Sequence, residues 1–150
     1  MPTLVSINIS PGGIPKVPVP QCQVSISGLE GDGQQHTKHR KPARAVSLLD
    51  IEIVQQLSSE GYPVDAGSLG ENLTMKGFSA GTLVVGSRLQ FGSGVVLELT
   101  EPRKPCFVLD AIHPALKDVT VGRLGWLAQV ITPGLLIAGQ EITILSPMKG

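Results

Sequence analysis

The sequence is poor in the features that define several large classes of protein. Aromatic residues make up only 3% of its 150 residues, and it has only two cysteines. Two cysteines cannot supply the several disulfides of a small secreted framework, so we expect a reduced, cytoplasmic protein. No apolar run approaches the roughly 20 residues of a membrane-spanning helix, and the N-terminus lacks the features of a signal peptide. The sequence therefore predicts no membrane attachment.

Neither sign of charge is in excess. Twelve Lys and Arg residues balance twelve Asp and Glu residues, so the formal net charge is zero. Nucleic-acid-binding domains attract their ligand with a positive field, which this chain lacks as a whole. We therefore expect no nucleic-acid partner, and any site for an anion must be local.

The abundant residues favour β-structure. Hydrophobic residues make up 41% of the chain, and because aromatics are scarce the core must be built from Val, Ile, Leu and Ala. Eighteen glycines and twelve prolines are spread along the chain, which is typical of many turns between short strands. A chain of this length can form one core. We expect a single domain over residues 1–150, mainly β, with a few short helices.

The local patterns locate most of these elements. Apolar or alternating segments predict strands over residues 4–9, 22–26, 43–48, 83–85, 88–91, 95–99, 127–131, 135–137 and 141–145. One segment has helical spacing instead, with Leu49, Ile53 and Leu57 on one face. We expect Ser47 to cap this helix and Gly61 to end it.

A stiff arm, residues 100–106, follows the predicted strand 95–99 and ends in Cys106. Two prolines in the arm fix their own φ and favour extended conformations in the residues before them. Arg103 and Lys104 place two positive charges near the thiol, and nearby cations favour the thiolate. Taken alone, the arm leaves two interpretations open: a reactive thiolate, or a small buried residue at the start of an apolar run.

The other cysteine and the histidines do not form a site by their spacing. Cys22 has no cationic neighbours in the sequence, so we expect it to pack in the core. His36 and His39 have no Cys or carboxylate at metal-ligand spacing, which favours a solvated loop. His113 lies seven residues after Cys106 and precedes a proline. Seven residues span about 10 Å along a helix axis, too far for direct proton transfer.

Two further segments carry polar groups where a strand is expected. Arg44 is flanked by small apolar residues in the predicted strand 43–48, and a buried arginine needs a carboxylate or an anionic ligand. Residues 67–75 combine two glycines with Glu71 and Asn72 just before an apolar strand. Glycine lets a backbone approach a partner closely, and the Glu-Asn pair offers hydrogen-bond acceptors and donors.

Five short motifs occur along the chain in a recognisable order. They are Ser10-Pro11-Gly12-Gly13, Gly28-Leu29-Glu30-Gly31-Asp32, Arg44-Ala45-Val46-Ser47-Leu48, Gly70-Glu71-Asn72-Leu73 and Pro102-Arg103-Lys104-Pro105-Cys106. Taken together they resemble the MOSC domain family, named for the C-terminal domain of molybdenum cofactor sulfurases, over about residues 10–145. The resemblance implies a β-barrel-like fold that binds the molybdenum cofactor (molybdopterin), a pterin with a phosphate and a metal held by a dithiolene.

The same resemblance implies roles for individual residues. Cys106 matches the family's cysteine, which ligates molybdenum in amidoxime-reducing relatives and is thought to carry sulfur in cofactor sulfurases. A soft thiolate suits a metal that is already bound by sulfur. Arg44 and Arg103 correspond to basic positions that can hold the pterin or its phosphate, to which a guanidinium donates paired hydrogen bonds. Lys16 and Asn72 are further cofactor-binding positions that the resemblance implies.

Three functions agree with these residues. In the leading hypothesis the protein is an enzyme: Cys106 ligates molybdenum and the domain reduces N-hydroxylated or N-oxygenated small substrates. Because the sequence has no nicotinamide or flavin motif and no pyridoxal-phosphate desulfurase domain, a separate electron donor or cysteine desulfurase would be the partner. The alternative is a non-enzymatic carrier that holds a persulfide or the cofactor on Cys106 and passes it on. In the third, Cys106 is buried and inert in a scaffold domain.

Overall fold

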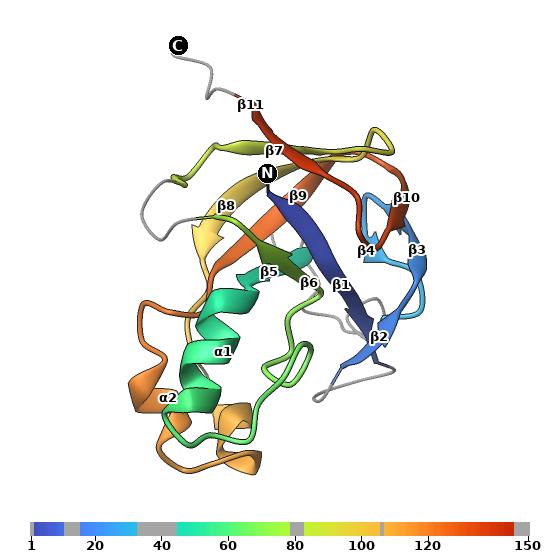
Figure 1. Ribbon diagram of the computed structural model, residues 1–150. Helices are drawn as coiled ribbons and strands as arrows, with labels where there is room; N and C mark the ends of the chain where they lie inside the picture. Colours follow the sequence, from blue (N-terminus) through green and yellow to red (C-terminus); the bar gives the residue numbers. More distant parts are fainter. Residues whose placement is uncertain (1, 11–15, 33–44, 79–82, 106, 146–150) are drawn as a thin grey trace.

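The computed structural model describes residues 2–10, 16–32, 45–78, 83–105 and 107–145. Within these residues the chain forms eleven strands, two α-helices and one 3₁₀ helix (Figure 1). In chain order they are β1 Thr3–Ile9, β2 Val17–Val19, β3 Gln21–Ser25, β4 Gly28–Leu29, β5 Val46–Asp50, α1 Ile51–Ser59, β6 Leu73–Lys76, β7 Arg88–Phe91, β8 Val96–Pro102, η3 Phe107–Ala111, α2 Leu116–Val119, β9 Trp126–Thr132, β10 Gly134–Ile137 and β11 Ile142–Leu145. The predicted mainly β fold with few short helices is therefore confirmed.

The strands form two sheets. The larger sheet has eight strands in the order β11-β7-β8-β9-β5-β6-β1-β2, and the smaller has three in the order β10-β3-β4. Every neighbouring pair is antiparallel except β5 and β6, which are joined by helix α1 and run parallel. A parallel pair needs such a crossover, because a tight turn can only join antiparallel strands.

The ends of the larger sheet approach each other. An isolated antiparallel bridge joins Thr3 of β1 to Glu141, the residue before β11. Two backbone hydrogen bonds extend this contact: Leu4 N donates to Gln140 O at 2.9 Å, and Gly139 N donates to Leu4 O at 2.7 Å. The sheet is therefore strongly curved, although the two sheets of the described chain do not join into one closed barrel.

The main core lies between the two sheets and is almost entirely aliphatic. Leu4, Ile7, Leu48 and Leu97 are fully enclosed in it, and Phe91 is among the few aromatic residues that contribute. Strand β5 is central, between β6 and β9, and its first four residues are all buried. This explains why residues 46–49 form an apolar run with only one polar member.

A second, smaller core lies beneath helix α1, on the same side of the molecule as η3 and α2 (Figure 1). Val54 and Leu57 are the buried residues of α1, and they pack with Leu49, Leu109 and Leu116. Successive residues of a strand point to opposite faces, so Leu48 enters the main core and Leu49 enters this one. The apolar stripe predicted for α1 is therefore confirmed as core.

Two predictions of local structure are wrong. The helix begins at Ile51 after Asp50, so Ser47 does not cap it: Ser47 lies in β5, which pairs with β9 and β6 up to Asp50. Residues 83–85 form no strand, because the chain turns there, with Val84 N donating to Ser87 Oγ at 3.0 Å. In the first case pairing with distant strands overrides the capping pattern, and in the second a local turn overrides the apolar pattern of a strand.

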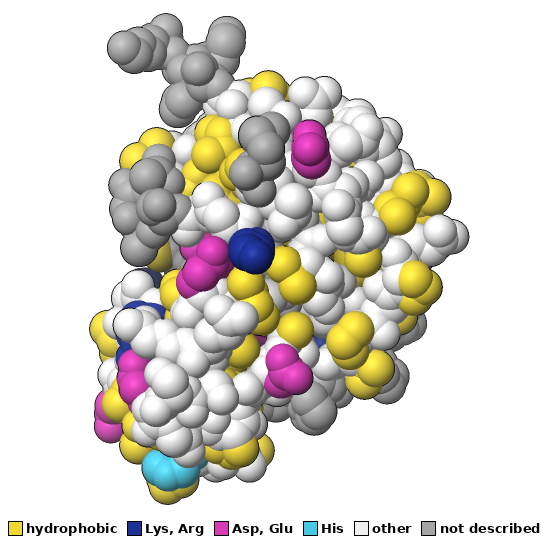
Figure 2. Space-filling model, in the orientation of Figure 1, with side chains coloured by type: hydrophobic (Ala, Val, Ile, Leu, Met, Phe, Trp, Pro, Cys, Tyr) yellow, Lys and Arg dark blue, Asp and Glu magenta, His cyan; other side chains and the backbone are white. Residues whose placement is uncertain are grey.

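The described surface agrees with the balanced composition. On the face shown in Figure 2, acidic and basic side chains are scattered among neutral and apolar ones. Within the described ranges there is also no helix that combines the length and the apolar character needed to cross a membrane.

Candidate functional site

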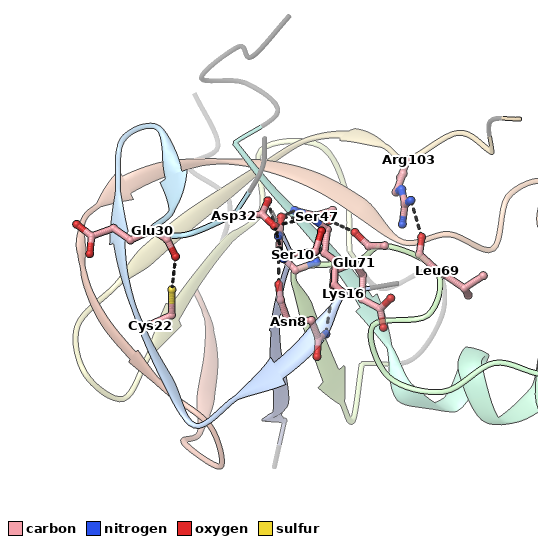
Figure 3. Close-up of polar contacts among 12 residues, drawn as sticks. Asn8, Ser10, Lys16, Cys22, Glu30, Asp32, Ser47, Leu69, Glu71 and Arg103 are labelled. Atoms are coloured by element: carbon pink, nitrogen blue, oxygen red, sulfur yellow. Dashed lines mark hydrogen bonds and ion pairs between the residues drawn. The ribbon is translucent and has the colours of Figure 1, made fainter. Parts of the chain in front are cut away.

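The buried polar residues of the described chain gather at one place. The described chain buries ten polar or charged residues, and eight of them are linked to one another by hydrogen bonds; Figure 3 draws part of this network. The eight are Ser6, Asn8, Ser10, Asp32, Ser47, Glu71, Asn72 and Thr74. They come from β1 and the residue that follows it, from the segment after β4, from β5, and from the segment that runs from residue 71 into β6. Buried polar groups are stable when hydrogen bonds satisfy them, so this network fixes the four segments relative to one another.

Asp32 forms an ion pair with Lys16 inside this network. The Lys16 Nζ lies 2.6 Å from Asp32 Oδ1, and the two side chains are 12% and 2% exposed. Ser10 N donates to the same carboxylate oxygen at 3.2 Å. The two opposite charges largely cancel, and the buried pair fixes the position of the Lys16 side chain.

Asn72 links the ion pair to strand β5. Its Nδ2 donates to Asp32 Oδ2 at 3.2 Å, and its Oδ1 accepts from Ser47 N at 3.0 Å. Asn72 is 1% exposed, so its side chain is enclosed by these partners. The contacts indicate that Asn72 acts on the site by holding Asp32 and β5 in place.

Glu71 is the second buried carboxylate, and it has no exposed surface. Its Oε2 accepts from Gly67 N at 3.0 Å and from Thr74 Oγ1 at 2.8 Å, while its Oε1 has no hydrogen-bond partner in the described chain. Burial raises the pKa of this carboxyl, and the two hydrogen bonds and the positive charge of Arg103 oppose that rise. A buried acid of this kind binds a proton more readily than an exposed one.

Residues 67–72, which we call the glycine turn, connect the two cations. Lys16 N donates to Gly67 O at 3.0 Å, and Arg103 Nη2 donates to Leu69 O at 2.7 Å (Figure 3). Gly67 adopts φ +85°, and a Cβ on it would lie 2.4 Å from Lys16 O. The glycine is therefore required both by the backbone conformation and by the close approach of residue 16.

We expect Gly67→Ala to destabilise the fold by about 2 kcal/mol more than Gly86→Ala. Gly86 is a matched control, because its φ is +92° but nothing lies within 4 Å of the added Cβ. Both variants carry the strain of a left-handed alanine, about 1 kcal/mol, and only Gly67→Ala adds a steric conflict with a backbone carbonyl. Urea unfolding of the three proteins measures the difference. Equal losses would contradict the close approach.

The structure brings three of the predicted site residues to this turn. Lys16 and Arg103 both bind its backbone, and Asn72 is its last residue. Arg103 is half-buried, and its own N donates to Gly125 O at 3.0 Å, which anchors the start of the cysteine arm. The turn thus contacts the backbone of Lys16 and the guanidinium of Arg103, and a guanidinium is suited to binding an anion with several oxygens.

Other predicted positions lie outside the described residues. Arg44 and Cys106 are among them, as are His36 and His39. Their roles as basic cofactor contact, thiolate and solvated loop therefore stay predictions.

Several residues of the network were not identified as site residues from the sequence. Asp32 was part of a motif without an assigned role, and Ser47 was interpreted as a helix cap. Asn8 lies in β1 at a position that an alternating pattern does not distinguish from a solvent-facing one. A polar residue within a segment that is buried on both faces is the signal that would have revealed Ser47.

The remaining cysteine and histidine contacts look structural. Cys22 is 7% exposed, as predicted, with its Sγ 3.4 Å from Glu30 O, and burial raises the pKa of its thiol (Figure 3). His113 Nδ1 accepts from Ala115 N at 3.0 Å, and its ring meets the edge of Tyr62. Among the residues that the structure describes, no three His, Cys, Asp or Glu side chains are grouped to hold a metal.

Comparison with known sequences identifies a family model and several relatives that match this chain. The model of the MOSC domain family matches residues 35–143. A protein named reductase from Gibberella moniliformis is 32% identical over 129 residues, which cover 81% of this chain and 23% of that protein. Protein YiiM from Escherichia coli is 28% identical over 147 residues, covering 91% of this chain and 65% of YiiM. The chain thus spans less than two thirds of the length of these relatives.

Solved structures agree with the sequence match. The crystal structure of Escherichia coli YiiM superposes with a TM-score of 0.75 at 25% identity and covers 97% of this chain and 70% of that chain. YiiM from Geobacillus stearothermophilus gives a TM-score of 0.82 at 24% identity, with 100% and 78% covered, which establishes likeness of fold alone.

Proposed function

Because this chain belongs to the MOSC domain family, we propose that it binds the molybdenum cofactor and reduces N-hydroxylated or N-oxygenated small molecules, with Cys106 as the protein ligand of the metal. The observation that carries the proposal is the glycine turn. The turn accepts one hydrogen bond from the backbone N of Lys16 and another from the guanidinium of Arg103, and Cys106 follows Arg103 by three residues.

The donors and acceptors of this segment fit the chemistry of the cofactor. The Lys16 ammonium has three N–H donors. Within the described chain one of them binds Asp32, and the others can bind phosphate oxygens. The guanidinium of Arg103 is already oriented by Leu69 O, so little entropy is lost when it binds an anion.

The role of Cys106 rests on its neighbours. Arg103 and Lys104 favour the thiolate, and a thiolate is a soft ligand that matches a metal bound by a dithiolene. When bound, the cofactor supplies the two-electron redox chemistry. Reduction of an N–OH group takes two electrons and two protons and releases water, and a redox partner is proposed to supply the electrons.

Reduction is the reaction that the relatives favour. The Gibberella moniliformis protein that shares 32% identity with this chain is named a reductase, although the chain covers only 23% of it. We therefore place reduction before the alternative in which Cys106 carries a persulfide or hands the cofactor on.

The proposal is tested by producing the protein in a host that makes the cofactor and measuring molybdenum and pterin in the purified protein. We expect close to stoichiometric amounts of both, and reduction of a hydroxylamine-type substrate when a reduced dye supplies electrons. Folded protein without either component, from a host with verified cofactor supply, would exclude binding. Bound cofactor without turnover under any donor would favour the carrier.

A further inference from the structure

Glu71 is the group in the site that the proposed function does not use. Its carboxylate is completely buried, yet Oε1 has no hydrogen-bond partner among the described residues. A native protein seldom leaves a buried carboxylate oxygen unpaired, because the lost hydration is not replaced. The oxygen therefore needs a physical explanation.

Glu71 and Arg103 are held by the same segment of backbone. Glu71 Oε2 accepts from Gly67 N at 3.0 Å, and Arg103 Nη2 donates to Leu69 O at 2.7 Å. Both side chains thus bind backbone groups of the same turn, two residues apart. The positive charge of Arg103 favours the ionised form of Glu71 and opposes the rise in pKa that burial causes.

The other charges around Glu71 largely cancel. From the connection after β1 and the segment after β4 come Lys16 and Asp32, which form an ion pair joined to the turn through Asn72. From β1 and β6 the contacts are uncharged: Asn8 Nδ2 donates to Glu71 O, and Thr74 Oγ1 donates to Glu71 Oε2. Arg103 is therefore the charge that acts most directly on Glu71 in the described chain.

We propose that Glu71 is a positioning residue that acts through Arg103: its carboxylate and a bound anion compete for the guanidinium charge, so that an anion binds together with a proton on Glu71. The inference rests on the proposed function only in placing an anion at Arg103. It requires neither the cofactor nor turnover.

The direction follows from linkage. Among the described residues, the two cations Lys16 and Arg103 and the two carboxylates Asp32 and Glu71 sum to zero when Glu71 is ionised, and protonation of Glu71 makes this sum one charge more positive. As the pH falls through the pKa of Glu71, the affinity for an anion therefore rises. In return, an anion at Arg103 masks the charge that favours ionised Glu71, so binding draws a proton from solvent.

The experiment uses sulfate as the anion and protein without the cofactor. Sulfate keeps the same charge between mildly acidic and mildly alkaline pH. Titration calorimetry should show about tenfold tighter sulfate binding at mildly acidic than at mildly alkaline pH. Repeating the titration in two buffers of different ionisation enthalpy should reveal uptake of a fraction of a proton per sulfate. This measurement needs no variant.

Glu71→Gln mimics the protonated acid, since its amide oxygen can still accept from Gly67 N and Thr74 Oγ1. At alkaline pH we expect it to bind sulfate about tenfold more tightly than the wild type, with no proton uptake at Glu71. Glu52→Gln is the control: it removes the same charge from an exposed side chain in the first turn of α1 and should keep the wild-type profile.

The direction of the change in sulfate affinity separates this role from a merely structural one. If Glu71 were only structural, its replacement would lower the affinity at every pH. Lower affinity in Glu71→Gln, an unchanged pH dependence, or no sulfate binding by the wild type would each overturn the proposal. Failure of the protein to take up molybdenum would affect the proposed function alone, because sulfate binding is measured without the cofactor.

Discussion

Cys106→Ala is expected to abolish turnover and to remove most of the bound molybdenum, while Cys22→Ala leaves both unchanged. The thiolate is the one ligand that this chain is proposed to give the metal, and alanine has no donor atom to replace it. Metal analysis of each purified variant and dye-driven reduction of a hydroxylamine-type substrate measure the two effects.

The structure explains why the arm is suited to hold a ligand at a fixed place. Strand β8 ends at Pro102, which pairs with Trp126 of β9, and Arg103 N then donates to Gly125 O at 3.0 Å. The segment leading to Cys106 is thus anchored up to three residues before the thiol. A ligand on an anchored segment loses less conformational entropy when it binds metal than one on a free loop.

Cys22 is the matched control because it is a second thiol with the opposite surroundings. It lies in the main core with 7% exposure, and burial raises the pKa of its thiol. Cys22→Ala removes one small buried atom and is expected to cost about 1 kcal/mol of stability without changing metal content. If Cys106→Ala kept its molybdenum and its activity, the thiolate ligand would be excluded and the scaffold hypothesis would gain support.

The sequence predicted the fold where local pattern and long-range packing agree. Alternation predicted β7, in which buried residues alternate with more exposed ones, and it also located β1, although residues 6–8 are all buried there. It misjudged the end of β5, where pairing with Thr74 and Met75 of β6 extends the strand through Leu49 and Asp50. Those partners lie far along the chain, so no local signal marks the later helix start.

The candidate site was predicted unevenly for a similar reason. Lys16, Asn72 and Arg103 followed from motif order, and the glycine turn was recognised from its glycines. That Asp32 is the partner of Lys16 depends on the meeting of two connections, one after β1 and one after β4, which sequence spacing does not reveal. Burial of Glu71 also depends on tertiary packing, because a Glu next to a turn glycine is usually exposed.

Asp32→Asn is expected to destabilise the fold by about 3 kcal/mol, although it changes only one atom of the side chain. Within the described ranges, the three groups that contact this carboxylate are all donors: Lys16 Nζ at 2.6 Å, Ser10 N at 3.2 Å and Asn72 Nδ2 at 3.2 Å. An asparagine has one oxygen and one NH₂ group. In either orientation its NH₂ group therefore faces a donor, and Lys16 loses its counter-charge.

The neighbouring amide cannot relieve this conflict by turning over. Asn72 Oδ1 accepts from Ser47 N at 3.0 Å, so a flipped Asn72 would direct its own NH₂ group at that backbone donor. The backbone of β5 thus fixes the orientation of the Asn72 amide, and the conflict between two donors remains at residue 32.

Glu98→Gln is the control, because the Glu98 carboxylate resembles that of Asp32. The two groups that bind it in the described chain are also donors, Arg88 Nε at 2.9 Å and Gln129 Nε2 at 2.7 Å. Its ion pair is much more exposed, with side-chain exposures of 42% for Arg88 and 23% for Glu98. Water can satisfy the groups that this variant leaves unpaired, so we expect a loss of at most about 1 kcal/mol. Chemical denaturation at neutral pH compares the two losses.

A second replacement isolates the charge. Lys16→Met in the Asp32→Asn background removes the ammonium that faces an amide, and it should recover part of the lost stability, with a coupling of about 1–2 kcal/mol. If Asp32→Asn cost no more than Glu98→Gln, or if the two replacements were additive, the ion pair would not stabilise the network. A loss confined to Asp32→Asn and partly reversed by Lys16→Met would mean that the buried pair holds Lys16 in place before any ligand binds.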